Sequence, residues 1–158
     1  MKSNLISKSE TAEVIKEIFS QWKVELPKIK NLKFHYFEDE VVIITCAGLK
    51  AIKIGELYLP FLTETEILKK FPYVMVDMGA VKFMCKGANV MRPGITNYTE
   101  FEKDQLVCVI EESQHKFLAI GRSCVSSTET KTMSKGEVVK NMHFISDKYW
   151  EAGKSIRD

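Results

Sequence analysis

The sequence is short of the residues that mark metal sites and disulfide-stabilised folds. Its 158 residues include 4 cysteines and 3 histidines, with no CxxC pair and no HExxH motif. Structural zinc sites usually supply closely spaced ligand pairs, so we expect no metal and no cofactor, with zinc ligation as the less favoured alternative. The cysteines are each flanked by apolar or small residues, which predicts reduced thiols packed as small hydrophobic side chains. These cysteines are Cys46, Cys85, Cys108 and Cys124.

Long apolar runs are also missing. The longest, VVIITCAGL, has 9 residues, whereas a helix that crosses a bilayer needs about 20. The N-terminal MKSNLISKSE lacks the apolar segment of a secretory signal peptide. Free thiols are typical of a reducing compartment. We therefore expect a cytoplasmic protein that does not associate with a membrane.

The common catalytic and nucleotide-binding motifs are absent too. The sequence has no GxSxG, no GxxxxGK[ST] and no GxGxxG. His35 and His143 fall in expected strands, where histidine is more often structural, while His115 lies in an expected turn and can reach a phosphate. Cys124 follows Arg122 closely, but a catalytic thiol needs a partner base that the sequence does not place. We expect no catalytic residues and no enzymatic activity.

What is present is the composition of a folded globular protein. The chain is 45% hydrophobic and 28% charged, and its length suits one ordinary domain or two small ones. Its net charge of +2 is too small to require a polyanionic partner by itself. Any argument for such a partner depends on where the charges lie.

The first half of the chain predicts a helix followed by short strands. Apolar residues recur at helical spacing through SETAEVIKEIFSQW, and Ser7 and Glu10 have the offset of a capping box. NLKFHYFEDEVVIITCAG predicts a hairpin that turns at residues 38–40, and KAIKIGELYLPFL predicts a second pair that turns at 55–56.

A second short helix should close this half. Thr63 and Glu66 predict another capping box, before a helix that ends ahead of Pro72.

The pattern changes near residues 71–72. After them come five short strands separated by turn residues, with Tyr149 and Trp150 at the end: YVMVD, NVMR, DQLVCVIE, KFLAIGRSCVSS and VVKNMHFIS. Such a series predicts a small, nearly closed β-barrel. No low-complexity linker separates the halves, so we expect them to pack directly on each other. The predicted class is α+β, with an α/β domain at 1–72 and a barrel domain at 73–158.

The segment VDMGAVKFMCKGANVMRPGI, residues 76–95, is the most specific part of the sequence. Asp77 is placed to cap a short helix, and Gly87 is placed to end it with a positive φ. Lys82 and Lys86 lie four residues apart, so they share a helix face and repel each other.

Charge in this region is one-sided. From Met78 to Thr99 the chain has three cations and no acid. Segregated cations and glycines that let the backbone approach closely are typical of phosphate-binding surfaces. A solvated basic helix face with structural glycines is the alternative, and the charge pattern alone does not decide between them.

The motifs of the second half, taken in order, resemble the PUA domain. They are VDMGAVKFMCKGANVMRPGI, KDQLVCVI, FLAIGRSCVSS and MSKGEVVKNMHFI, although Lys103-Asp104 stands where many PUA domains have Gly-Asp. The resemblance implies a pseudo-barrel of about six strands that binds RNA through its first helix, the glycine loop and the next strand. The RNA-binding residues that it implies are Gly79, Ala80, Lys82, Lys86, Gly87, Ala88, Asn89, Arg92 and Gly94.

Each of these residues has an expected role. Lys82, Lys86 and Arg92 would neutralise phosphates, and Asn89 would read a base edge or a sugar hydroxyl. Amides of the helix start, at residues 79–80, would bind phosphate, and Gly87 would allow close approach.

The first 72 residues resemble the pre-PUA domain, and the two-domain order resembles the translation-machinery-associated group that includes the malignant T-cell amplified sequence protein and ligatin, in its archaeal stand-alone form. The resemblance implies a non-catalytic factor of initiation or recycling that binds ribosomal or transfer RNA. A translation-factor partner would bind residues 1–72. The alternatives are a protein-interaction scaffold, with an exposed apolar patch at Leu57, Tyr58, Leu59 and Phe61, or an accessory subunit of RNA modification.

Overall fold

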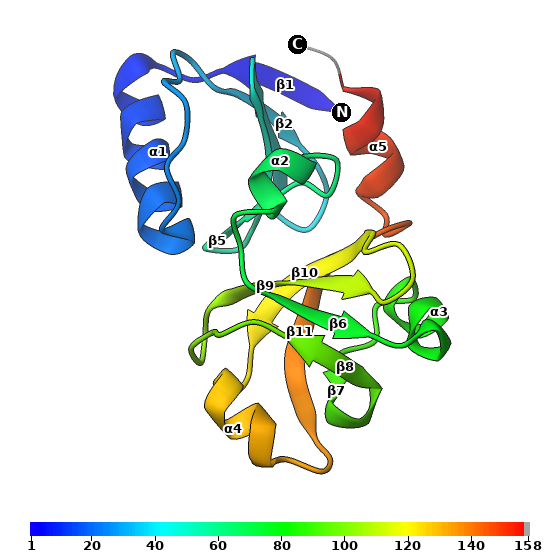
Figure 1. Ribbon diagram of the computed structural model, residues 1–158. Coiled ribbons are helices and arrows are strands. Elements are labelled where there is room, and N and C mark those ends of the chain that lie inside the picture. The colour runs from blue at the N-terminus through cyan, green and yellow to red at the C-terminus, as the bar shows by residue number, and fades with distance from the viewer. Residues whose placement is uncertain (157–158) are drawn as a thin grey trace.

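The structure, a computed structural model, describes residues 1–156 and contains two β-sheets stacked end to end (Figure 1). The first is a five-stranded antiparallel sheet whose strands lie side by side in chain order. Its unit consists of β1 (Lys2–Leu5), α1 (Lys8–Trp22), β2 (Lys33–Tyr36), β3 (Val41–Cys46), β4 (Leu49–Ile54), β5 (Leu57–Pro60) and α2 (Thr65–Leu68).

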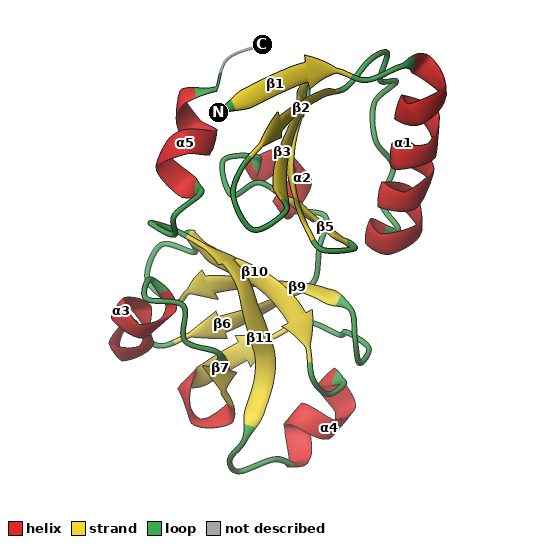
Figure 2. Cartoon of the chain, turned by 180° about the vertical axis from the view of Figure 1, so that it is seen from behind, coloured by secondary structure: helices red, strands yellow, loops and turns green. Residues whose placement is uncertain are grey.

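The second sheet has six strands and curls into a nearly closed pseudo-barrel (Figure 2). Its order is β7-β11-β10-β9-β6-β8, and β6 runs parallel to β9. This architecture confirms the predicted α+β class. The elements are β6 (Tyr73–Val76), η1 (Met78–Ala80), α3 (Val81–Met84), β7 (Val90–Met91), η2 (Arg92–Gly94), β8 (Ile95–Tyr98), β9 (Leu106–Glu111), β10 (Phe117–Ser123), α4 (Ser127–Thr132), β11 (Glu137–Phe144) and α5 (Trp150–Ser155).

The two predicted capping boxes have different outcomes. At α1 the Glu10 N–H donates to Ser7 Oγ at 3.1 Å, and the Ser7 N–H donates to Glu10 Oε1 at 3.3 Å, so the first box is confirmed. The second is wrong. Helix α2 begins after Glu64 with no side-chain cap, because the Thr63 hydroxyl donates instead to the adjacent Glu64 carboxylate at 3.1 Å.

The first strand was not predicted, because its four residues are all exposed and show no apolar alternation. It pairs with β2, and Ser3 Oγ lies 2.9 Å from His35 Nδ1. The other imidazole nitrogen of His35 lies 2.8 Å from Thr45 Oγ1. His35 is therefore a buried structural residue, as expected from its position in a strand.

The C-terminal segment packs on the N-terminal unit instead of ending the barrel. Tyr149 is buried, and Trp150 stacks on Phe61 with 5.7 Å between ring centroids. Lys50 Nζ donates to the Gly153 carbonyl at 2.7 Å. The expected place of Tyr149 and Trp150 at the barrel end is therefore wrong. The division of the chain at residue 72 stays a prediction.

The predicted apolar patch on β5 is wrong as well. Tyr58, Leu59 and Phe61 are buried and Leu57 is half-buried. Trp22 of α1 donates its indole N–H to the Tyr58 carbonyl at 2.8 Å, so α1 covers this strand. These side chains belong to the core and leave no exposed patch here for a partner.

His143 joins the two units. It is fully buried, with Nδ1 2.6 Å from Asp147 Oδ2, and its Nε2 accepts the Leu62 N–H at 3.3 Å. Leu106, Cys108 and Ile120 of the barrel share one apolar cluster with the N-terminal core. The units thus pack directly on each other, as predicted.

All four cysteines carry free thiols, and only Cys108 is fully buried. None of the helices in residues 1–156 has the length and apolar character needed to cross a bilayer.

Candidate nucleic-acid interface

The segment from Asp77 to Gly87 folds around two fixed points. Asp77 Oδ1 accepts the Ala80 N–H at 2.9 Å, so Asp77 caps η1 as predicted. Gly87 has a φ of +92°, and a Cβ there would lie 3.0 Å from the Phe144 ring. A side chain at this position would be both strained and crowded. Glycine is therefore required for the loop to turn back onto β11.

A second contact brings η2 alongside η1. The Asp77 N–H donates to the Gly94 carbonyl at 3.0 Å, and a Cβ at Gly94 would lie 3.7 Å from that of Ala80. Between these elements lies a hollow of about 450 Å³, called here the α3 hollow. It is lined by Val76, Asp77, Gly79, Ala80, Phe83, Met84, Ala88, Asn89, Val90, Met91, Pro93 and Gly94.

Five of the nine predicted residues line this hollow: Gly79, Ala80, Ala88, Asn89 and Gly94. The other four do not. Gly87 shapes the loop behind it, and Lys82, Lys86 and Arg92 lie outside the lining. The structure therefore brings five residues of the motif together around one hollow, while its three cations lie outside the lining.

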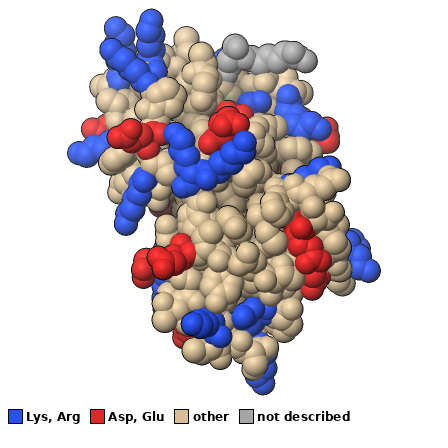
Figure 3. Space-filling model, in the orientation of Figure 1, with Lys and Arg blue, Asp and Glu red and all other residues tan. Residues whose placement is uncertain are grey.

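Lys82 and Lys86 are exposed, and within residues 1–156 neither ammonium lies within 4 Å of a carboxylate. Lys82 Nζ lies 5.2 Å from the centroid of the Phe83 ring, which places one positive charge at the rim of the α3 hollow. Figure 3 has the orientation of Figure 1 and shows basic atoms at the edge of the barrel where Figure 1 places α3. Both side chains are thus free to meet a phosphate.

The helix start is less available than expected. The Ala80 N–H donates to Asp77, and the Met78 N–H donates to Glu112 Oε1 at 3.3 Å. Two carboxylates therefore already accept the N–H groups that a phosphate would bind. The predicted role of the Ala80 amide is corrected: it is part of the cap.

Arg92 is also engaged within the protein. Its Nε donates to the Thr130 carbonyl at 2.8 Å and its Nη1 to the Ile95 carbonyl at 3.4 Å. The guanidinium lies 5.8 Å from the Tyr98 ring centroid, and the residue is half-buried. Arg92 thus links η2 and β8 to α4. These bonds use two of the five N–H donors of the guanidinium, so its phosphate contact stays a prediction.

Asn89 has a similar outcome. Its Nδ2 donates to the Glu137 carboxylate, and its Oδ1 accepts the Asn141 N–H at 3.0 Å. Both ends of the amide hold the loop against β11. These bonds use one of the two N–H groups of the amide and one lone pair of its oxygen, so the base-reading role of Asn89 stays a prediction.

Sequence reasoning missed the apolar part of the site. Phe83 is 53% exposed and Met91 49% exposed, and both line the α3 hollow. Helical spacing could have identified Phe83, because Val81, Met84 and Cys85 already occupy the core face of the short helix. Because Phe83 lies outside that face, its side chain does not pack into the core and stays exposed.

The arrangement provides an open apolar hollow, one exposed aromatic ring, the Lys82 ammonium at the rim and the exposed Lys86 nearby in sequence, with both lysines outside any ion pair among residues 1–156. Such a set can stack a base and neutralise neighbouring phosphates. Among residues 1–156, no three His, Cys, Asp or Glu side chains are grouped so that they could hold a metal ion.

Comparison with known proteins identifies the fold of the chain and its second unit. The family model of the PUA domain matches residues 72–145. A solved structure of a hypothetical protein from the archaeon Pyrococcus horikoshii aligns with a TM-score of 0.81 and 28% identity. The alignment covers 96% of this chain and 99% of that one.

Two curated relatives extend the match to both units. An uncharacterised protein of Methanocaldococcus jannaschii is 31% identical over 94% of this chain and 95% of its own length. Translation machinery-associated protein 20 of Schizosaccharomyces pombe is 32% identical over 80% of this chain and 74% of its own length. The chain therefore belongs to the family of translation machinery-associated protein 20 and the malignant T-cell-amplified sequence proteins, and it carries a PUA domain.

Proposed function

We propose that this protein is a non-catalytic RNA-binding factor of translation whose α3 hollow contacts the RNA. The PUA domain and the names of the relatives support the coarser role, RNA binding in association with translation. To that role we add two statements: the RNA contacts the α3 hollow, and the protein catalyses no reaction.

One observation supports the place more than any other. Lys82 and Lys86 are exposed and unpaired within the described residues, and the exposed Phe83 lies between them in sequence, on the wall of the hollow. Phosphate contacts supply most of the affinity of such surfaces, and an aromatic ring adds about 1–3 kcal/mol for each stacked base. A single-stranded or splayed segment fits best, because its bases are free to stack.

The cysteines favour a binding role over nucleophilic chemistry. Burial raises the pKa of the Cys85 and Cys124 thiols, and it raises that of Cys108 much more. A thiol with a raised pKa carries little thiolate at neutral pH, and the thiolate is the nucleophile. The fully buried His143 is held by Asp147 and Leu62.

The cellular role that we infer is in initiation or recycling in the cytoplasm, on ribosomal or transfer RNA. A translation-factor partner that binds residues 1–72 is part of the same proposal. Phe19, 54% exposed on α1, is one apolar residue that such a partner could cover.

The site is tested by the salt dependence of RNA binding. Lys82→Ala/Lys86→Ala removes two cations, so we expect the slope of log Kd against log salt to fall by about 1.5 units. The measurement is a fluorescence titration with transfer RNA and with ribosomal RNA at several salt concentrations.

The matched control is Lys16→Ala/Lys103→Ala, which removes two other exposed and unpaired lysines within residues 1–156. Its slope should stay close to that of the parent. If the Lys82 and Lys86 variant also binds as the parent does at every salt concentration, the RNA contact lies elsewhere.

A further inference from the structure

A second acid-free group of lysines lies on the N-terminal unit, outside the PUA match. From Leu26 to Phe37 the chain has three cations, Lys28, Lys30 and Lys33, and no acid. The first nine residues add Lys2 and Lys8, again without an acid. The sequence motifs of the barrel do not account for this group.

The strand register fixes the place of Lys33 within this group. On the antiparallel sheet Lys33 lies directly opposite Leu5 of β1 on one side and Thr45 of β3 on the other. Side chains opposite each other share one face of a sheet. The loop before β2 borders this face and encloses a hollow of about 510 Å³, called here the lysine hollow. Its lining, which contains no acid, is Leu5, Lys28, Ile29, Lys30, Asn31, Lys33, Thr45, Cys46 and Ala47.

The loop that carries the lysines is held at its C-terminal end. The Ile6 N–H donates to the Leu32 carbonyl at 3.0 Å, and Asn31 Nδ2 donates to the Ile6 carbonyl at 3.3 Å. The Leu32 N–H donates to the buried Thr11 hydroxyl at 3.3 Å. Because the backbone is already fixed, binding a ligand here costs less conformational entropy than ordering a free loop.

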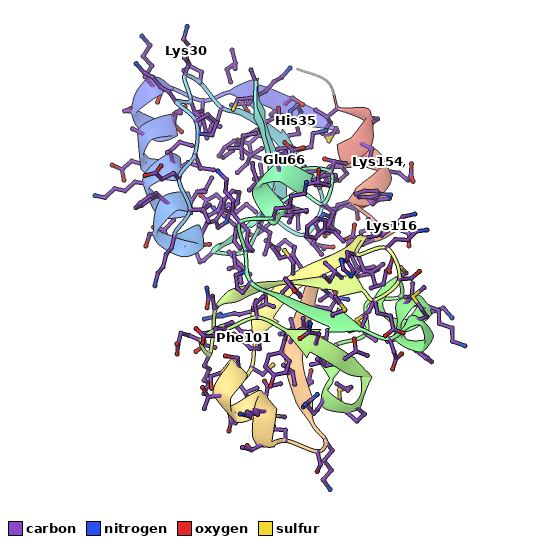
Figure 4. The ribbon with its side chains drawn as sticks, in the orientation of Figure 1. Lys30, His35, Glu66, Phe101, Lys116 and Lys154 are labelled. Atoms are coloured by element: carbon purple, nitrogen blue, oxygen red, sulfur yellow. The ribbon has the colours of Figure 1, made fainter. Side chains whose placement is uncertain are left out.

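The charges of the group are not balanced by ion pairs in the part of the chain that the structure describes. Among residues 1–156, Lys28, Lys30 and Lys33 form no ion pair. Leu5, beside them, is 68% exposed. Figure 4 places Lys30 at the end of the N-terminal unit farthest from the barrel, and Figure 3 shows basic side chains projecting from that end. Close like charges repel, and an incoming polyanion relieves this repulsion.

We propose that the lysine hollow is a second RNA-binding surface, which contacts the phosphate backbone. Its lining has three lysines, two of them exposed, and no acid, so its charge complements a chain of phosphates, which lysines bind as point charges. The surface extends the proposed function, since an RNA that reaches both hollows would be held at two separated points of the molecule. It does not depend on the α3 hollow, because its lysines belong to the other sheet.

The test uses the full chain and three double variants that each remove two lysines. They are Lys28→Ala/Lys30→Ala, Lys82→Ala/Lys86→Ala, and Lys16→Ala/Lys103→Ala as the control. Binding to a labelled single-stranded RNA, long enough to span both units, is titrated at several salt concentrations. We expect Lys28→Ala/Lys30→Ala to lower the salt slope by about 1.5 units, as two lost phosphate contacts predict. Polyglutamate at the same charge concentration serves as the competitor.

The outcomes separate the two surfaces. A fall in slope for the Lys28 and Lys30 variant, with no fall for the control, supports the second surface whatever the Lys82 and Lys86 variant does. A parental slope for the Lys28 and Lys30 variant overturns it, even if the α3 hollow is confirmed. Displacement of RNA from the Lys82→Ala/Lys86→Ala variant by polyglutamate at the same charge concentration also overturns it, because an acidic protein segment would then be the better ligand. Unchanged thermal unfolding of each variant shows that folding is intact.

Discussion

The two sheets of this protein are of similar size but are built in different ways. The N-terminal strands pair in chain order, each with its sequence neighbour. In the barrel, β6 lies between β8 and β9 and pairs in parallel with β9, so its contacts join segments that are distant in sequence. An antiparallel meander such as the N-terminal sheet can form from many apolar patterns. The barrel needs particular residues where strands that are distant in sequence meet. This difference explains why the recognisable motifs come from the barrel.

Glycine shows the difference at the level of single residues. Gly121 lies at a bulge between β10 and β11, and a Cβ there would be 1.9 Å from the Lys140 carbonyl oxygen. Gly153 lies in α5, where a Cβ would be 2.2 Å from the Phe61 ring. The first neighbour is backbone held by a sheet, and the second is the ring of a fully buried side chain.

The largest predicted effect follows from this contrast. Gly121→Ala should lower the free energy of unfolding by about 3 kcal/mol or more, because the β10–β11 pairing must open to admit a methyl group. Gly153→Ala should cost about 1 kcal/mol, since the gain in helix propensity offsets part of the clash with Phe61. Urea unfolding of both variants at neutral pH gives the two values. Equal losses of unfolding free energy would mean that the β10–β11 pairing tolerates an added methyl group as well as the α5 contact with Phe61 does.

Local patterns predicted much of the fold. The α1 helix with its cap, the hairpins and five barrel strands follow from periodicity and turn residues over short stretches. The misses have physical reasons. Strand β1 is exposed on every residue, so it carries no apolar signal. The C-terminal residues from Tyr149 cross back to the N-terminal sheet, and only tertiary contacts such as the Phe61–Trp150 stacking determine that.

The site was predicted in the same uneven way. Glycine positions could be placed because backbone geometry requires them, as at Gly87 with its positive φ. Polar side chains could not, because their partners come from distant segments: Asn89 from Glu137 and Asn141, Arg92 from Thr130. A motif thus identifies which residues matter, while the structure decides whether each one faces the ligand or the fold.

The next effect in size compares two phenylalanines, one on each unit. Phe83 is 53% exposed on α3 and Phe19 is 54% exposed on α1. Phe83→Ala should weaken binding of single-stranded RNA about tenfold, the loss expected when one base no longer stacks. Phe19→Ala should leave RNA binding unchanged. Both should alter stability by less than about 0.5 kcal/mol, since neither side chain is buried.

Fluorescence titration with the same RNA tests both variants at one salt concentration. Equal losses for Phe83→Ala and Phe19→Ala would show that exposed rings act nonspecifically. In that case the α3 hollow would lose its special role.

The smallest expected effect concerns two carboxylates, one at a turn of each sheet. On the N-terminal unit Asp39 accepts from exposed Lys148 at 2.8 Å, an exposed pair of the kind that contributes about 0–1 kcal/mol. In the barrel Glu111 accepts the Gln114 N–H at 2.6 Å, and this backbone hydrogen bond holds the pKa of Glu111 below its usual value.

A lowered pKa in the folded state makes the ionised carboxylate stabilising. Its contribution is complete above the unfolded-state pKa of about 4.3 and is lost as pH falls through the lower folded-state value. The difference in unfolding free energy between the parent and Glu111→Gln should therefore be constant from pH 7 to about pH 5 and shrink below about pH 4. Urea unfolding at a series of pH values measures it, with the exposed Glu100→Gln as the matched control. A difference that stays constant into strong acid would show that Glu111 acts through its shape and not its charge.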